Sequence, residues 1–313
     1  MTTIANDISA DLAAAVRAAP QPLRIVGSGS KDFYGRVSEG DALNVSGHRG
    51  IVAYEPTELV ITARAGTRLS EIEAALATHQ QMLGFEPPYF GDGATLGGTI
   101  ACGLSGPRRP YSGSARDFVL GTRIINGSGE ILTFGGQVMK NVAGYDVSRL
   151  MVGALGTLGV LLEISLKVVP RPEQEITLTQ MIEPARALTA IAQMNARPVP
   201  LGGCCYGDGI LYIRLAGATA AVATARAAIG GDVLTNDTEF WRDLREQRLG
   251  FFGNDTPLWR LSLPPAAPAP DLPGRWWLDW GGAQRWLKTD APAASIFDAA
   301  RALGGHATLF RGG

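Results

Sequence analysis

The chain has 313 residues, of which 46% are hydrophobic and 18% are charged, and its formal net charge is −1. This length allows two domains with substantial cores, and the apolar content excludes an intrinsically disordered chain. The balanced charge argues against a nucleic-acid partner held by phosphate neutralisation. Glycine is in excess, with 40 residues against a usual share of about 7%. The glycines are densest between residues 84 and 159, which indicates backbone close to a ligand or a series of tight turns.

The sequence carries no targeting or spanning segment that we recognise. No apolar run reaches the roughly 18 residues that a membrane-spanning helix needs, and the N-terminus has no basic and apolar regions of a secretory signal. The three cysteines, Cys102, Cys204 and Cys205, do not form a disulfide framework. Reduced thiols in the cytoplasm are therefore expected.

The first 83 residues alternate helix and strand. Apolar residues every fourth position over Ile4–Val16 predict an amphipathic helix, and Leu23–Val26 predicts a short strand. Leu59–Ala65 predicts a second strand. A helix follows over Leu69–Leu76, and Ser70 with Glu73 could form its capping box.

From Gly84 onward the helical period is lost. Phe118–Ile125 and Glu130–Phe134 are predicted strands, and Asn126–Gly129 between them is a hairpin signal. Val160–Val169 is a further predicted strand. It ends at a Pro-Arg-Pro sequence, residues 170–172, which predicts a domain boundary.

Beyond this boundary the pattern again mixes helices and strands. We predict helices at residues 181–196, 218–229, 239–249 and 295–303, and strands at 209–215, 258–263 and 276–280. Pro264–Pro273 reads as a linker. The tryptophans of this half are more typical of a core than of a cofactor stack.

Three glycine-rich segments are candidates for ligand binding. Gly27–Lys31 follows a strand but is not a Rossmann fingerprint, because Asp32 stands where the third glycine belongs. Its amides could surround an anion, with Lys31 adding a positive charge, although an ordinary turn is the commoner explanation. Ala94–Gly103 could bring backbone against a ligand or pack on its own sheet. Gly153–Val160 is weak evidence alone, since helix packing or turns would explain its glycines.

Other chemistry is scarce. His48, His79 and His306 lack the spacing of zinc ligands, and no cysteine set suits an iron–sulfur cluster. Gly103–Gly106 does not match the nucleophile elbow of serine hydrolases. The pair Arg108 and Arg109 could bind an anion, lie in solvent or contact a partner. We predict no metal site and assign no catalytic residue.

Six stretches together identify a resemblance that extends from about residue 21 to the end of the chain. The chain resembles flavoproteins of the vanillyl-alcohol-oxidase and p-cresol-methylhydroxylase type. Within them it is most similar to the smaller flavin-binding subunits of bacterial glycolate oxidase, also called glycolate dehydrogenase. The stretches are His48–Val52, Pro56–Arg64, Cys102–Pro110, Arg116–Gly121, Gly135–Asp146 and Asp279–Ala283.

The resemblance implies that the chain binds FAD. It assigns the pyrophosphate to the loop residues Gly27, Ser28, Gly29, Ser30 and Lys31. It places Thr95, Leu96, Gly97, Gly98, Thr99, Ala101 and Ser105 on the path toward the flavin ring. It places Gly159 and Val160 on the adenosine side. Because the first loop contains no histidine, we expect non-covalent FAD.

The resemblance also implies an α+β fold with a defined domain order. A two-lobed FAD-binding domain is expected over residues 1–170, with lobes at 1–83 and 84–170, followed by a mixed α/β cap at 171–300. Family members continue past Gly313. Residues 301–313 are therefore expected to begin a truncated segment that returns to the flavin domain.

The implied activity is oxidation of glycolate, and of D-lactate, to the 2-oxo acid in a complex with a larger FAD-binding subunit and an iron–sulfur subunit. Residues 171–300 contain no histidine that could act as a base. We therefore expect an accessory or electron-transfer role in the cytoplasm, with at most peripheral association with the inner face of the cytoplasmic membrane. A free-standing FAD-dependent 2-hydroxy-acid dehydrogenase and a non-catalytic scaffold subunit remain alternatives.

Overall fold

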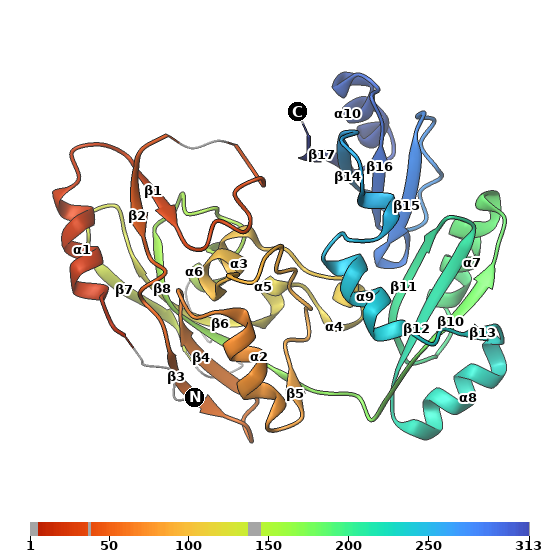
Figure 1. Cartoon of the computed structure of the whole chain (residues 1–313), viewed down its shortest axis with the longest axis horizontal. Coiled ribbons are helices and arrows are strands. Elements are labelled where there is room, and N and C mark those ends of the chain that lie inside the picture. Colours follow the sequence, from red (N-terminus) through yellow and green to blue (C-terminus); the bar gives the residue numbers. More distant parts are fainter. Residues whose placement is uncertain (1–5, 37–38, 137–144, 313) are drawn as a thin grey trace. The chain divides into compact units, whose positions relative to one another are not determined.

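The computed structural model describes residues 6–36, 39–136 and 145–312. They form two compact units. Figure 1 shows the chain coloured along the sequence, from red at the N-terminus to blue at the C-terminus. The first unit contains the residues up to Gly106 together with Gly113–Arg171, and the second contains Pro107–Ser112 together with the residues from Pro172 onward. The chain therefore enters the second unit at Pro107, returns at Gly113 and enters it again at Pro172. The residue pattern predicts no such excursion before residue 170.

The first unit is built on a five-stranded antiparallel sheet with strand order β3-β4-β8-β6-β7. Strands β1 and β2 form a separate parallel pair, and β5 pairs with β9. The described elements are α1 (Ser9–Ala18), β1 (Leu23–Val26), β2 (Asp41–Asn44), β3 (Ile51–Glu55), β4 (Val60–Arg64), α2 (Leu69–Ala77), β5 (Gln81–Met82), α3 (Leu96–Cys102), α5 (Ala115–Phe118), β6 (Val119–Ile125), β7 (Ile131–Gly135), α6 (Val147–Leu150), β8 (Val160–Lys167) and β9 (Val169–Pro170).

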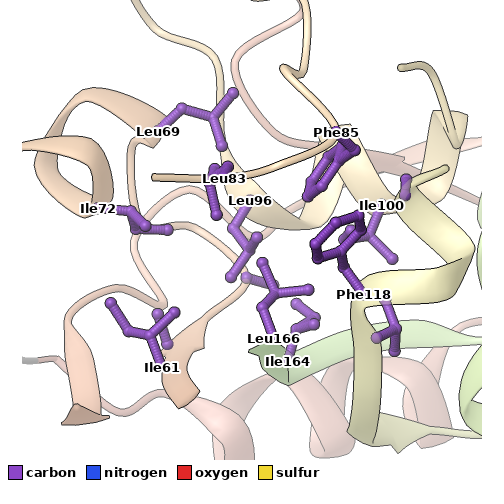
Figure 2. Close-up of a cluster of buried hydrophobic side chains, with 14 of the residues drawn as sticks. Ile61, Leu69, Ile72, Leu83, Phe85, Leu96, Ile100, Phe118, Ile164 and Leu166 are labelled. Atoms are coloured by element: carbon purple, nitrogen blue, oxygen red, sulfur yellow. The ribbon is translucent and has the colours of Figure 1, made fainter. Parts of the chain in front are cut away.

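Helices α2 and α3 share a core with the sheet. Leu69, Ile72 and Leu76 recur at helical spacing on α2 and are fully buried. They pack in one cluster with Ile164 and Leu166 of β8, and Figure 2 shows Leu69, Ile72, Ile164 and Leu166 of this cluster. The helix predicted over Leu69–Leu76 is thus confirmed.

The predicted capping box on this helix is wrong. The helix already begins at Leu69, so Ser70 lies inside its first turn, and Arg68 occupies the N-cap position without a side-chain capping bond. A capping box does exist at Ser114 and Asp117, at the start of α5. The Ser114 backbone N–H donates to Asp117 Oδ2 at 2.8 Å.

The predicted β6–β7 hairpin is confirmed. Ile125 pairs with Ile131 across the turn, and Asn126 stabilises the turn through its side chain. The Oδ1 atom of Asn126 accepts hydrogen bonds from the amides of Ser128 at 2.9 Å and Glu130 at 3.0 Å. An asparagine that accepts bonds from its following amides is a common way to hold such a turn.

His48 anchors the segment that leads into α1. Its ring is fully buried, and its Nδ1 atom accepts a hydrogen bond from the Ile8 amide at 3.2 Å. An imidazole can accept at Nδ1 only when it is neutral. Burial lowers the pKa of His48 below 6.5; Asp7 and Glu163 oppose this effect, and Arg64 and Arg123 add to it.

This burial predicts a pH dependence of folding. A histidine with a lowered folded-state pKa contributes its full stability above its ordinary pKa of 6.5, and that contribution falls as pH drops below 6.5 toward the folded value. We expect the free energy of unfolding to fall between about pH 7.5 and 5.5, because the unfolded chain protonates His48 more readily than the folded chain does. His48→Asn retains an acceptor oxygen but does not titrate. Urea unfolding of both proteins across this pH range should therefore show a smaller pH slope for the variant, and equal slopes would contradict the prediction.

The second unit contains an eight-stranded antiparallel sheet with strand order β13-β10-β12-β11-β15-β16-β14-β17. Helix α4 lies in Pro107–Ser112, the segment that belongs to this unit although the chain then returns to the first unit. The described elements are α4 (Arg109–Ser112), β10 (Gln174–Met181), α7 (Pro184–Asn195), β11 (Leu201–Gly207), β12 (Ile210–Gly217), α8 (Thr219–Ile229), β13 (Asp232–Val233), α9 (Asp237–Arg245), η1 (Gly250–Phe252), β14 (Leu258–Ser262), β15 (Arg275–Asp279), η2 (Trp280–Gly282), β16 (Gln284–Lys288), α10 (Ala293–Ala302) and β17 (His306–Arg311).

The end of the described chain corrects one expectation. Residues 301–313 were expected to return to the flavin domain, but His306–Arg311 form β17, which pairs antiparallel with β14 of the second unit. Strand β17 lies at the edge of this sheet, and its residue Phe310 is buried. This part of the chain therefore completes the second unit.

Two predicted features fall outside the described residues. Ile4, the first apolar position of the predicted N-terminal helix, is one, and residues 137–144 of the Gly135–Asp146 stretch are the other. No helix in the described parts of the chain combines the length and apolar content that crossing a bilayer requires.

Candidate functional site

The loop that follows β1 forms one wall of a cavity in the first unit. It turns back on itself through hydrogen bonds from the Asp32 amide to Gly29 O at 3.1 Å and from the Tyr34 amide to Lys31 O at 2.9 Å. Gly29 has φ +73°, a conformation that glycine adopts without steric cost. A side chain there would also approach Asp32 Oδ2 at 3.2 Å.

Lys31 carries a buried positive charge within this loop. Its side chain lines the cavity although only 7% of the residue is exposed. The ammonium group donates to the Tyr89 carbonyl at 3.1 Å and lies 3.5 Å from Ser30 Oγ. These two contacts give the ammonium group of Lys31 a defined position.

Helix α3 forms the facing wall. Thr95 is its N-cap, and the Thr95 hydroxyl accepts a hydrogen bond from the Gly98 amide at 3.3 Å. The Gly97 amide donates to Ala65 O at 2.7 Å, and a Cβ at Gly97 would lie only 2.7 Å from Ala65 Cβ. A Cβ at Gly27 would lie 3.0 Å from Thr95 Oγ1. Glycine at position 27 therefore lets the loop approach the start of α3, and glycine at position 97 lets α3 approach the backbone at Ala65.

Helix α3 is not predicted from the sequence, because its glycines hide the helical period. This helix divides the predicted residues between two faces. Gly97, Gly98 and Ala101 line the cavity, whereas Leu96 and Thr99 are buried on the other side. Helical geometry places residues 97, 98 and 101 on one side of α3 and residues 96 and 99 on another.

The cavity has a volume of about 720 Å³, which is within the range of small-molecule and cofactor sites. Ten of the predicted site residues line it. They are Gly27, Ser28, Gly29, Ser30, Lys31, Thr95, Gly97, Gly98, Ala101 and Gly159. The three glycine-rich segments, far apart in sequence, thus meet around one space.

The other four predicted residues do not line this cavity. Leu96 and Val160 belong to hydrophobic core clusters. Thr99 is fully buried, and its hydroxyl has no hydrogen-bond partner among the described residues. The hydroxyl of Ser105 accepts a hydrogen bond from the Ala115 amide at 3.0 Å.

Several lining residues were not predicted. They come from β1, from the end of the first loop, from the end of α3, and from the third glycine-rich segment and the residues next to it. They include Arg24, Ile25, Asp32, Tyr34, Arg36, Cys102, Met151, Leu155, Gly156, Thr157 and Leu161. The glycines of residues 153–159 were the available signal for the last group.

Cys102 faces the cavity as a neutral thiol. Burial raises its pKa to about 11, with Asp32 adding to this effect and Lys31 opposing it. A thiol with this pKa remains protonated at neutral pH and is a poor nucleophile.

The lining suits a dinucleotide with a central pyrophosphate. Lys31, Arg24 and Arg36 supply positive charge, and Asp32 offsets part of it. Ile25, Leu155 and Leu161 supply apolar surface to the same cavity. Glycines leave room along the backbone, so the residues present fit FAD in charge and in shape.

Comparison with known proteins agrees with this geometry. Residues 6–135 match a family model described as an FAD binding domain. The glycolate oxidase subunit GlcE of Escherichia coli (strain K12) is 56% identical over 292 residues, which are 93% of this chain and 83% of that protein. The chain belongs to the GlcE family.

Two further matches differ in how much of this chain they cover. The glycolate oxidase subunit GlcD of Bacillus subtilis (strain 168) is 39% identical over 109 residues, which are 34% of this chain and 23% of that protein. A solved alkyldihydroxyacetonephosphate synthase has the same fold, with a TM-score of 0.69 at 15% identity, covering 96% of this chain and 69% of that one. The expected α+β FAD-binding fold is therefore confirmed, and the chain is an FAD-binding protein. Non-covalent attachment remains a prediction.

Proposed function

We propose that the chain is the FAD-binding subunit of a complex that oxidises glycolate, and D-lactate, to the corresponding 2-oxo acid. The observation that carries this proposal is the 56% identity to a glycolate oxidase subunit along almost the whole chain. The cavity supports it, because three separate segments of this chain surround one space suited to FAD.

Oxidation of a 2-hydroxy acid needs a base for the hydroxyl proton, a cation for the carboxylate and a hydride acceptor. Bound FAD would supply the acceptor. Lys31, with the loop of residues 27–30, would hold the pyrophosphate, and the glycines of α3 would let the cofactor lie against the backbone. These residues bind and orient, but none of them is a base at neutral pH.

The second unit supports an accessory role. Residues 171–300 contain no histidine, and His306 lies on β17 with its side chain exposed. The neutral Cys102 thiol also cannot accept a proton in the cavity. We therefore assign proton removal to a larger catalytic flavin subunit and assign FAD binding, electron transfer or assembly to this one.

The proposed partners are this larger FAD-binding subunit and an iron–sulfur subunit. The match to GlcD over 109 residues supports a common origin for the two flavin subunits. We place the complex in the cytoplasm, with peripheral attachment to the inner face of the membrane. Co-purification with a tagged chain and fractionation of the cells would test both statements.

A visible absorption spectrum followed by glycolate addition tests the function. The purified chain is expected to show flavin absorbance, and anaerobic glycolate should bleach it only when the larger subunit is present. D-Lactate should act in the same way, and succinate serves as a control without a 2-hydroxyl group. Bleaching in the isolated chain would contradict the accessory role and support a free-standing 2-hydroxy-acid dehydrogenase. A chain without flavin that cannot be reloaded would instead support a scaffold.

A further inference from the structure

The segment Pro107–Ser112 leaves the FAD-binding unit directly after the cavity-lining helix. Its two ends are held together in the first unit. The Ser105 hydroxyl accepts a hydrogen bond from the Ala115 amide at 3.0 Å, and the Gly106 amide donates to Phe85 O at 2.9 Å. Four residues separate Cys102 on the cavity wall from Pro107, so the two Cα atoms lie at most about 18 Å apart.

Within the second unit this short segment is tightly anchored. The Arg109 guanidinium lies 4.4 Å from the centre of the Trp280 ring, which is a cation–π contact. The Tyr111 hydroxyl donates to Asn195 Oδ1 at 3.2 Å, and the Tyr111 ring packs against the core beneath the sheet. A six-residue stretch with this many contacts is unlike a loop lying in solvent.

Arg108 makes the most buried polar contact of the segment Pro107–Ser112. Only 6% of this residue is exposed, and its guanidinium pairs with Glu175 at 2.5 Å. Glu175 also lies 3.5 Å from the guanidinium of Arg214, which is 2% exposed. A Cβ at Gly202 would come within 3.1 Å of the Arg108 guanidinium, so the glycine leaves space for it.

Arg214 extends this network into the sheet. Its guanidinium donates twice to Gly202 O, at 3.1 and 2.8 Å, and lies 4.4 Å from the centre of a Trp241 ring. Trp241 in turn donates from its indole N–H to Thr177 Oγ1 at 2.7 Å. Removing one member of a buried charged network leaves the remaining charges without compensation, which is costly.

We propose that the segment Pro107–Ser112 couples FAD binding in the first unit to the stability of the second unit, with Arg108 as the positioning residue. FAD fixes the cavity-lining helix, the helix leads into the segment, and the segment belongs to the core of the second unit. Two sites become linked in this way when one element is ordered by both. The coupling depends on FAD binding and is independent of which hydroxy acid is oxidised.

Tryptophan fluorescence makes the coupling measurable. All six tryptophans lie between residues 241 and 286, so their fluorescence reports unfolding of the second unit alone. In the wild-type chain, FAD at about 100 times its dissociation constant should raise the midpoint of thermal unfolding of the tryptophan signal by about 5 °C. In Arg108→Gln and Glu175→Gln, the FAD-induced rise in this midpoint should be less than half of the wild-type rise. Flavin fluorescence should still show that both variants bind FAD.

The control is Arg301→Gln, which removes an exposed ion pair with Asp298 in the same unit and should keep the full rise. A merely structural role for Arg108 would lower the midpoint equally with and without FAD and leave the rise intact, which would overturn the proposal. If the variants do not fold, hydrogen exchange of the wild-type chain decides. FAD should slow exchange in β10–β12, and unchanged exchange there would overturn the proposal.

Discussion

Replacing Lys31 with methionine is expected to weaken FAD binding by about 10- to 100-fold. The lysine is buried in the cavity wall, and its ammonium group is held by the Tyr89 carbonyl at 3.1 Å. A charged hydrogen bond to a phosphate oxygen in such a position contributes more than a neutral one. Methionine has a similar length and no charge, so the packing of the loop is retained and the charge is lost.

Titration of the apo-chain with FAD, followed by flavin fluorescence, measures this effect. Lys167→Met makes the same chemical change on β8, outside the cavity lining, and should bind FAD normally. Thermal unfolding without FAD shows whether the Lys31 variant is folded. A folded Lys31→Met protein with wild-type affinity would show that the pyrophosphate is held elsewhere.

Gly159→Ala is expected to lower the free energy of unfolding of the first unit by about 3 kcal/mol or more. Gly159 has φ +141°, which residues with a side chain rarely adopt, and its added Cβ would lie 2.5 Å from the Ile125 carbonyl oxygen. Ile125 is the last residue of β6 and pairs with Val160. The methyl group would therefore push apart two neighbouring strands of the sheet where they begin to pair.

Gly153→Ala is the matched control. Gly153 has φ +82°, but no atom lies within 4 Å of its added Cβ, so only the backbone strain of about 1–2 kcal/mol is expected. Urea unfolding without FAD should be followed by circular dichroism, because the tryptophans report only the second unit. Equal destabilisation by the two substitutions would show that the contact with Ile125 relaxes at little cost.

Much of the fold could be predicted because it depends on local patterns. Apolar spacing identified α2 through Leu69, Ile72 and Leu76, and Asn126 with its glycines identified the β6–β7 hairpin. The same local reasoning failed at α3. Glycine and alanine at the cavity-facing positions removed the polar–apolar contrast on which helical periodicity depends.

From the sequence, the segments that line the cavity could be predicted more accurately than the individual residues that face it. The three glycine-rich segments could be selected from sequence because glycine permits close approach of backbone to a ligand. Which side chain faces the cavity depends on the secondary structure of each segment. Leu96 and Thr99 were therefore selected together with Gly97 and Gly98, although the helix turns the first two into the core.

The sequence by itself determined that the chain carries an FAD-binding domain and a second domain, since both follow from residue patterns and family-specific stretches. Only the tertiary structure decided that three segments spanning residues 24–161 enclose one cavity, that Pro107–Ser112 belongs to the second unit, and that His306–Arg311 complete its sheet. The reason is physical. Local propensity depends on neighbours in the chain, whereas a cavity wall, a buried ion pair such as Arg108 with Glu175, and a strand pairing depend on residues that only folding brings together.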